Sequence, residues 1–110
     1  MARLFVYGTL APGRANHGLL ADIPGDWRSA ILKGRLLQEG WGAAQGCPGI
    51  VPASDGDDVR GHLLTSPELD LHWSRLDAFE GEGYRRVEVS VRIDGGEWVA
   101  AFVHALNRNE

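Results

Sequence analysis

Asp77 and Glu80, near the end of a predicted helix, are the carboxylates whose spacing could support acid and base chemistry. Residues three apart share one face of a helix, although carboxylates at this spacing are usually just solvated. Glu80 differs because it directly follows Phe79 on the apolar stripe and lies in the last turn, where the helix dipole opposes negative charge. If Glu80 is partly buried, we expect a raised pKa, which suits a base that must also return its proton. An exposed terminal glutamate remains the simpler interpretation of this stretch alone.

The segment from Gly8 to Gly13 follows an apolar strand and has the glycine spacing of a phosphate-binding P-loop. The match fails at the chemically important positions, because Arg14 and Ala15 stand where Lys and then Ser or Thr are needed. Pro12 also removes one backbone donor. Two interpretations stay open: an ordinary turn, or a set of exposed amides that binds an anion such as a carboxylate.

Metal and cofactor chemistry have little support in the sequence. The histidines show no ligand spacing such as i, i+4, and they are His17, His62, His72 and His104. The single cysteine, Cys47, excludes internal disulfides and a cysteine-rich metal site, and it agrees with a reducing compartment. We therefore expect no cofactor and no metal.

Length and charge restrict the class of protein further. A chain of 110 residues predicts one domain over 1–110, and a net charge of -4 with well-mixed signs makes nucleic acid an unlikely partner class. No segment approaches the apolar run of about 20 residues that spans a bilayer. The few residues before Gly8 are too short for the apolar region of a signal peptide. We expect a cytoplasmic protein without a membrane partner, of undetermined oligomeric state.

Hydrophobic patterning predicts several short strands, separated by glycine-rich turns. Residues 11–28 read as irregular, Gly34 marks a bulge or a close backbone approach, and the turn at 94–96 joins the last two strands as a hairpin. The expected strands cover 3–7, 29–37, 50–51, 59–64, 84–93 and 97–106.

The clearest helix is predicted between Ser66, a natural N-cap, and Gly81, the expected C-terminal stop. Pro67 suits its first position. One apolar stripe follows the helical spacing and consists of Leu69, Trp73, Leu76 and Phe79. One firm helix with five or six strands predicts an α+β domain with a mixed or barrel-like sheet.

Taken in order, the motifs of this chain resemble those of the gamma-glutamylcyclotransferase-like family, in particular its short bacterial branch. The series comprises a strand ending Y-G-T-L, a following P-G, a central P-G-I, a G-H-L-L strand and L-D-x-F-E-G-x-x-Y-x-R. Each motif alone is only moderately specific for the family, but the whole series in this order, in so short a chain, is strongly specific. The resemblance runs from Leu4 to about Ala105. It implies a small mixed α+β barrel with one main helix and an active cleft at one end.

The family resemblance also implies roles for individual residues. The glutamate of F-E-G, Glu80, is the expected catalytic acid and base. The Y-G-T-L backbone is expected to hold the glutamyl end of the substrate, and it comprises Tyr7, Gly8, Thr9 and Leu10. Tyr84 is expected as a pocket wall or hydrogen-bond partner. The further pocket candidates are Phe102, His104 and Arg86. His104 replaces the tyrosine usual in relatives, and its simpler interpretation is a satisfied strand histidine. Arg86 matches the arginine of the family and is structural as readily as functional.

The implied activity is cyclisation of a γ-glutamyl amine or peptide to 5-oxoproline, with release of an amine and without a metal or cofactor. The α-amine of the substrate attacks its own γ-carbonyl, so the protein supplies proton transfer and charge stabilisation. Two alternatives stay open: a non-catalytic module of the same fold that binds small carboxylates, and an amidohydrolase in which Glu80 activates water.

Overall fold

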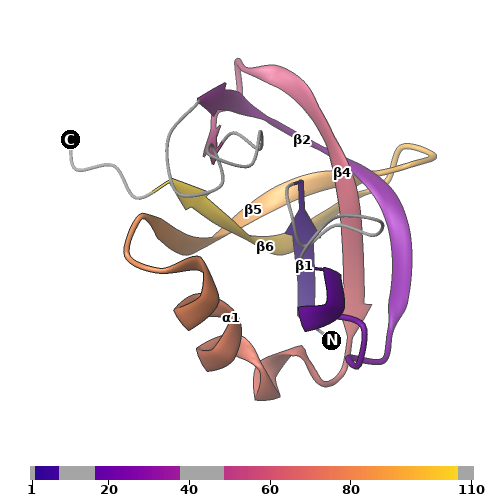
Figure 1. Ribbon diagram of the computed structural model, residues 1–110. Coiled ribbons are helices and arrows are strands. Elements are labelled where there is room, and N and C mark those ends of the chain that lie inside the picture. Colours follow the sequence, from indigo (N-terminus) through magenta and orange to yellow (C-terminus); the bar gives the residue numbers. More distant parts are fainter. Residues whose placement is uncertain (1, 8–16, 38–48, 107–110) are drawn as a thin grey trace.

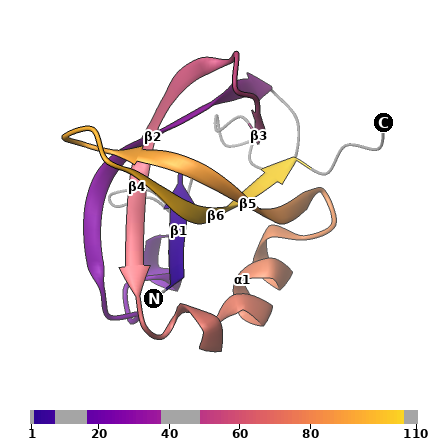
Figure 2. The same ribbon diagram turned by 180° about the vertical axis from the view of Figure 1, so that it is seen from behind.

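The computed structural model describes residues 2–7, 17–37 and 49–106. These segments form a small barrel of strands with one α-helix against its outer side (Figures 1 and 2). In chain order the elements are β1 (Ala2–Val6), η1 (His17–Leu19), β2 (Asp26–Leu37), β3 (Gly49–Pro52), β4 (Asp57–Ser66), η3 (Leu69–Leu71), α1 (Trp73–Glu80), β5 (Tyr84–Ile93) and β6 (Trp98–Leu106). The prediction of an α+β fold with a mixed, barrel-like sheet is therefore confirmed.

The barrel closes through a contact between strands that are far apart in the sequence. The sheet order is β3-β2-β4-β1-β6-β5, and β2 also pairs with β5 where Ala30 lies opposite Ile93. The β1–β6 pair is parallel and the remaining pairs are antiparallel. Strand β3 pairs with the far end of β2, at Gly34 to Leu37. Five strands thus form the closed wall, and β3 extends it at one end.

Alternation along β1 divides the core into two layers. Phe5 points into the barrel, where it packs with residues of the other four wall strands and with Ile50 of β3. Leu4 and Val6 point outward and pack under the helical segments. This outer layer also contains the fully buried Leu69 and Leu76 and the partly buried Trp73 and Phe79. The predicted apolar stripe is confirmed as the surface that attaches the helical region to the barrel.

The predicted helix is wrong in its first half. Ser66 is the last residue of β4, and its Oγ accepts a hydrogen bond from the Glu68 N–H at 3.0 Å. A 3₁₀ turn follows, and α1 begins only at Trp73 because His72 has a φ of -118° and a ψ of -1°. The i→i+3 hydrogen bonds of this segment run from Leu71 N–H to the Glu68 carbonyl and from His72 N–H to the Leu69 carbonyl. They tighten the backbone after β4 and place the Leu69 side chain in the core. The predicted stop at Gly81 is confirmed.

Other boundaries differ at the start of the chain. The segment 11–28 was expected to be irregular, but its described part contains η1, and β2 begins at Asp26. The early start is explained by pairing, because Asp26 to Arg28 lie opposite Leu63 to Thr65 of β4. The close approach at Gly34 is confirmed, since a Cβ there would lie 2.9 Å from the Val51 carbonyl oxygen. The predicted hairpin between β5 and β6 is also confirmed.

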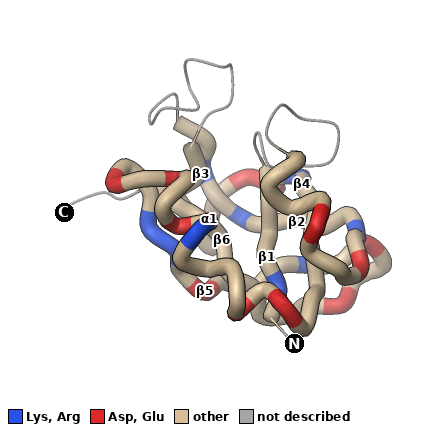
Figure 3. Tube along the Cα trace, turned by 60° about the horizontal axis from the view of Figure 1, so that its bottom comes forward, with Lys and Arg blue, Asp and Glu red and all other residues tan. Residues whose placement is uncertain are grey.

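Charged residues of both signs are distributed along the described chain. Acidic and basic residues alternate on the same segments of the trace (Figure 3). Within the described ranges, no helix has the length and apolar character needed to cross a membrane.

Candidate functional site

Most of the predicted site residues lie near the junction of α1 with the β5–β6 hairpin. Glu80 ends α1 and Tyr84 begins β5. Arg86 lies further along β5, and Phe102 and His104 lie on β6. Tyr7 directly follows β1. The remaining predicted residues, Gly8, Thr9 and Leu10, lie outside the described residues, so their substrate-binding role stays a prediction.

Glu80 is not exposed, so the simpler interpretation of this stretch, an exposed terminal glutamate, is wrong. The residue is half-buried, and this burial raises the pKa of its carboxyl to about 7. The helix ends immediately after it, where the Gly81 N–H donates to the Asp77 carbonyl at 3.0 Å and Gly81 has a φ of 82°. A carboxyl group with this pKa exchanges protons readily near neutral pH, which is the property required of a combined acid and base.

The raised pKa of Glu80 predicts a pH-dependent stability difference for Glu80→Gln. Between the unfolded value of 4.5 and about 7, the folded protein binds more protons at this site, so its stability falls as pH rises through that window. Glutamine has no such titration. We expect Glu80→Gln to melt at a higher temperature than wild type at pH 8 and at a similar temperature at pH 5. Thermal melts at both pH values test this, and an equal difference at pH 5 and pH 8 would contradict it.

The Tyr7 side chain joins three parts of the barrel end. Its hydroxyl donates to the His104 carbonyl at 2.9 Å and accepts from the Ile50 N–H at 3.1 Å. These two bonds connect the end of β1 with β6 and β3. From the sequence, the backbone of Tyr7 was expected to bind the substrate. The role of its side chain in joining three strands was not predicted, because it depends on contacts between segments that are far apart in the sequence.

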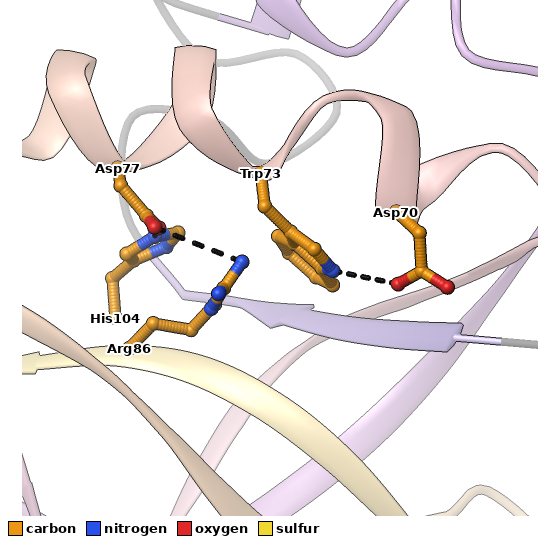
Figure 4. A network of polar contacts seen from close by, with 5 residues as sticks. All are labelled: Asp70, Trp73, Asp77, Arg86 and His104. Carbon is orange, nitrogen blue, oxygen red and sulfur yellow. Dashed lines mark hydrogen bonds and ion pairs between the residues drawn. The ribbon is translucent and has the colours of Figure 1, made fainter.

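The sequence singled out Asp77 only as a carboxylate that shares a helix face with Glu80, and it did not predict the contacts of this side chain with the β5–β6 hairpin. Its Oδ1 lies 2.8 Å from His104 Nε2, and its Oδ2 lies 3.7 Å from Arg86 Nη1 (Figure 4). The Arg86 guanidinium also lies 4.3 Å from the centre of the Trp73 ring, a cation–π distance. The side chains of His104 and Arg86, predicted as pocket residues, thus both contact α1.

Two hollows border predicted site residues, and Glu80 is not among the lining residues of either. One of about 620 Å³ lies where α1 meets the hairpin, and its lining includes Tyr84, Arg86 and His104. Another of about 650 Å³ has Tyr7 in its lining and lies among β2, β4 and the end of β5. Among the residues that the structure describes, no three His, Cys, Asp or Glu side chains are grouped so that they could hold a metal ion.

The described residues form a closed, mixed barrel with a half-buried carboxyl at the end of α1, which places them in the class of small α+β barrel proteins. The family model for gamma-glutamyl cyclotransferase, AIG2-like, matches residues 4–110. The chain belongs to this gamma-glutamylcyclotransferase family, and the family expected from its motifs is confirmed.

Individual relatives agree with this assignment. The chain is 34% identical over 108 residues to the Bacillus subtilis protein named "Putative gamma-glutamylcyclotransferase YkqA", covering 96% of this chain and 35% of YkqA. It therefore spans about a third of the length of that curated relative. The crystal structure of YkqA superimposes with a TM-score of 0.72 at 33% identity, over 96% of this chain and 36% of that one. An AIG2-like protein from mouse superimposes with a TM-score of 0.74 at 27% identity, over all of this chain and 80% of that one.

Proposed function

We propose that the protein is an enzyme that cyclises γ-glutamyl amines or peptides, releasing 5-oxoproline and an amine. The observation that carries the proposal is the half-buried carboxyl of Glu80, whose pKa is raised to about 7 at the end of α1. Membership of the family supports the same reaction class.

The reaction forms one bond and breaks one bond within the substrate. The α-amine loses a proton to Glu80 and attacks the γ-carbonyl carbon, which closes a five-membered ring. The tetrahedral intermediate then breaks its bond to the leaving nitrogen while Glu80 returns the proton to that nitrogen. Intramolecular attack has effective molarities of about 10⁵ M or more when the groups are well oriented. The protein therefore needs mainly to fold the substrate and to move one proton.

In this proposal the remaining site residues bind and orient the substrate. Backbone amides of Tyr7, Gly8, Thr9 and Leu10 hold the glutamyl carboxylate or the developing oxyanion. Tyr84, the first residue of β5, is assigned to the wall of the substrate pocket or to a hydrogen bond with the substrate. A cytoplasmic location, where small γ-glutamyl compounds are available, completes the proposal.

Product analysis tests the proposal directly. The purified protein is incubated with a panel of γ-glutamyl amines and γ-glutamyl dipeptides, and 5-oxoproline and free glutamate are measured separately. We expect 5-oxoproline, formed in equal amount to the released amine. Free glutamate instead would assign an amidohydrolase, and substrate binding without either product would assign a non-catalytic binding module.

A further inference from the structure

Two pairs of side chains face each other between α1 and the β5–β6 hairpin, about one helical turn before Glu80. On the helix, Trp73 and Asp77 are four residues apart and therefore share a face. On the hairpin, Arg86 and His104 are register partners, so their side chains lie next to each other on one face of the sheet. Figure 4 shows the two pairs in contact. Helical and strand periodicity together bring these residues to one place.

The His104–Asp77 contact is a hydrogen bond from a neutral ring near pH 7. Burial lowers the pKa of His104, and the hydrogen bond and charge of Asp77 oppose this only in part. The ring therefore donates its Nε2 proton to the Asp77 carboxylate at 2.8 Å. His104 is 4% exposed, whereas the Asp77 side chain is 43% exposed. Hydrogen bonds to an ionised carboxylate are shorter and stronger than those between neutral groups, so the buried His104 ring fixes the position of the Asp77 side chain.

Helix α1 depends on such contacts for its position. It has eight residues, and an isolated helix of this length is not stable in water. Leu76, in the middle of α1, is fully buried. Four clamp residues connect the helix to the hairpin: Trp73 and Asp77 on α1 contact Arg86 and His104 on the hairpin. Asp77 acts twice, because its side chain binds His104 while its carbonyl accepts the N–H of Gly81. Glu80 lies between these two anchored points of the chain.

We propose that His104 and Asp77 are positioning residues for Glu80, and that their hydrogen bond holds the last turn of α1 at the depth where the Glu80 carboxyl is half-buried. The proposal rests on the proposed function, since it assigns the bond a role in proton transfer. Arg86 supports the same turn from β5 through Asp77 and the Trp73 ring. Three further charged groups near this junction are exposed, and they are Asp70, which accepts a hydrogen bond from Trp73 Nε1 at 2.8 Å, Glu82 and Arg85.

Titration of Glu80 in variants of His104 tests the proposal without relying on activity. The Glu80 carboxyl is followed by ¹³C NMR in glutamate-labelled full-length protein, with its signal assigned by its loss in Glu80→Gln. In His104→Leu the last turn loosens and water reaches the carboxyl, so we expect the pKa to fall by about one unit or more toward the ordinary value. His104→Gln retains a side-chain donor and is expected to restore most of the shift. Both variants keep the backbone carbonyl that accepts from Tyr7.

The kinetic arm measures 5-oxoproline formation in the same variants. A misplaced catalytic group costs about 10- to 100-fold in rate, so kcat should fall in His104→Leu, with KM changing less. The double variant with Asp77→Leu should lose no more than Asp77→Leu alone, because that single variant already removes the His104 hydrogen bond together with the Arg86 contact. If wild type turns over none of the γ-glutamyl compounds, the proposed function fails while the titration still decides this proposal.

Two controls separate positioning from general stability. Val103→Ala opens a cavity inside the barrel and lowers the melting temperature, but it lies in the other core layer and should leave the Glu80 pKa unchanged. His72→Gln removes a histidine whose ring contacts Arg75 at the start of α1, and it should also change nothing at Glu80. An unchanged Glu80 pKa in His104→Leu, or an equal fall in Val103→Ala, would overturn the proposal.

Discussion

Replacing Glu80 by glutamine is expected to reduce kcat/KM for 5-oxoproline formation by about 10²- to 10⁴-fold, the usual contribution of a general acid or base. Glutamine has nearly the same shape but can neither accept nor return the proton of the attacking amine. Wild-type kcat/KM should fall as pH drops below about 7, because the protonated carboxyl of Glu80 cannot act as a base. Steady-state kinetics from pH 5 to pH 9 measure both effects.

Glu88→Gln is the matched control for this experiment. It makes the same change of charge and shape on the exposed side of β5, and it should retain wild-type rates. Because Glu80→Gln is expected to be at least as stable as wild type at pH 8, its loss of rate there cannot be attributed to unfolding. Full turnover by Glu80→Gln on any active substrate would show that another group performs the proton transfer.

Gly61→Ala is expected to destabilise the barrel by about 1–3 kcal/mol, the usual cost of overpacking. A Cβ at this position would lie 2.5 Å from the Val6 carbonyl oxygen and 2.6 Å from Cζ of the buried Phe5. The carbonyl belongs to a paired strand, and the Phe5 ring is 1% exposed, so neither group can move away easily. For a domain of this size, the melting temperature should fall on the order of 10 °C. Thermal denaturation followed by circular dichroism measures the shift.

Gly18→Ala serves as the control for added volume. Among the described residues other than its chain neighbours, no atom lies within 4 Å of a Cβ built at Gly18, which is an exposed residue of η1. Its melting temperature should stay within about 2 °C of wild type, as surface substitutions usually do. The same small change in Gly61→Ala would mean that β4 and β1 pack less closely there.

Local patterns predicted the elements whose causes are local. The alternation of Val87, Val89 and Val91 identified β5, and the glycine after Glu80 identified the end of α1. These features follow from spacing along one segment, which a sequence displays directly. The position of Glu80 in the last turn predicted the direction of its pKa shift only on condition of burial, and the burial itself was not predicted, because an exposed glutamate was the simpler interpretation of this stretch.

Features that depend on distant partners were not predictable in the same way. The early start of β2 follows from its pairing with β4, and the break at His72 follows from the path that turns Leu69 into the core. The partnership of Asp77 with His104 needs both the β5–β6 register and the placement of α1. Periodicity in one segment carries no information about these pairings. The roles of Gly8, Thr9 and Leu10 remain predictions.

The parallel pairing of β1 with β6 has a consequence for how the chain folds. Leu4 pairs with Phe102, so the barrel wall joins residues separated by almost the whole sequence. Before β6 is available, β1 has β4 on one side and an unpaired row of backbone groups on the other. Contacts of such high sequence separation form late and slowly, because much of the chain must be ordered first. During synthesis on the ribosome, closure of the barrel must therefore wait until β6 has emerged, and β1 needs protection from aggregation until then.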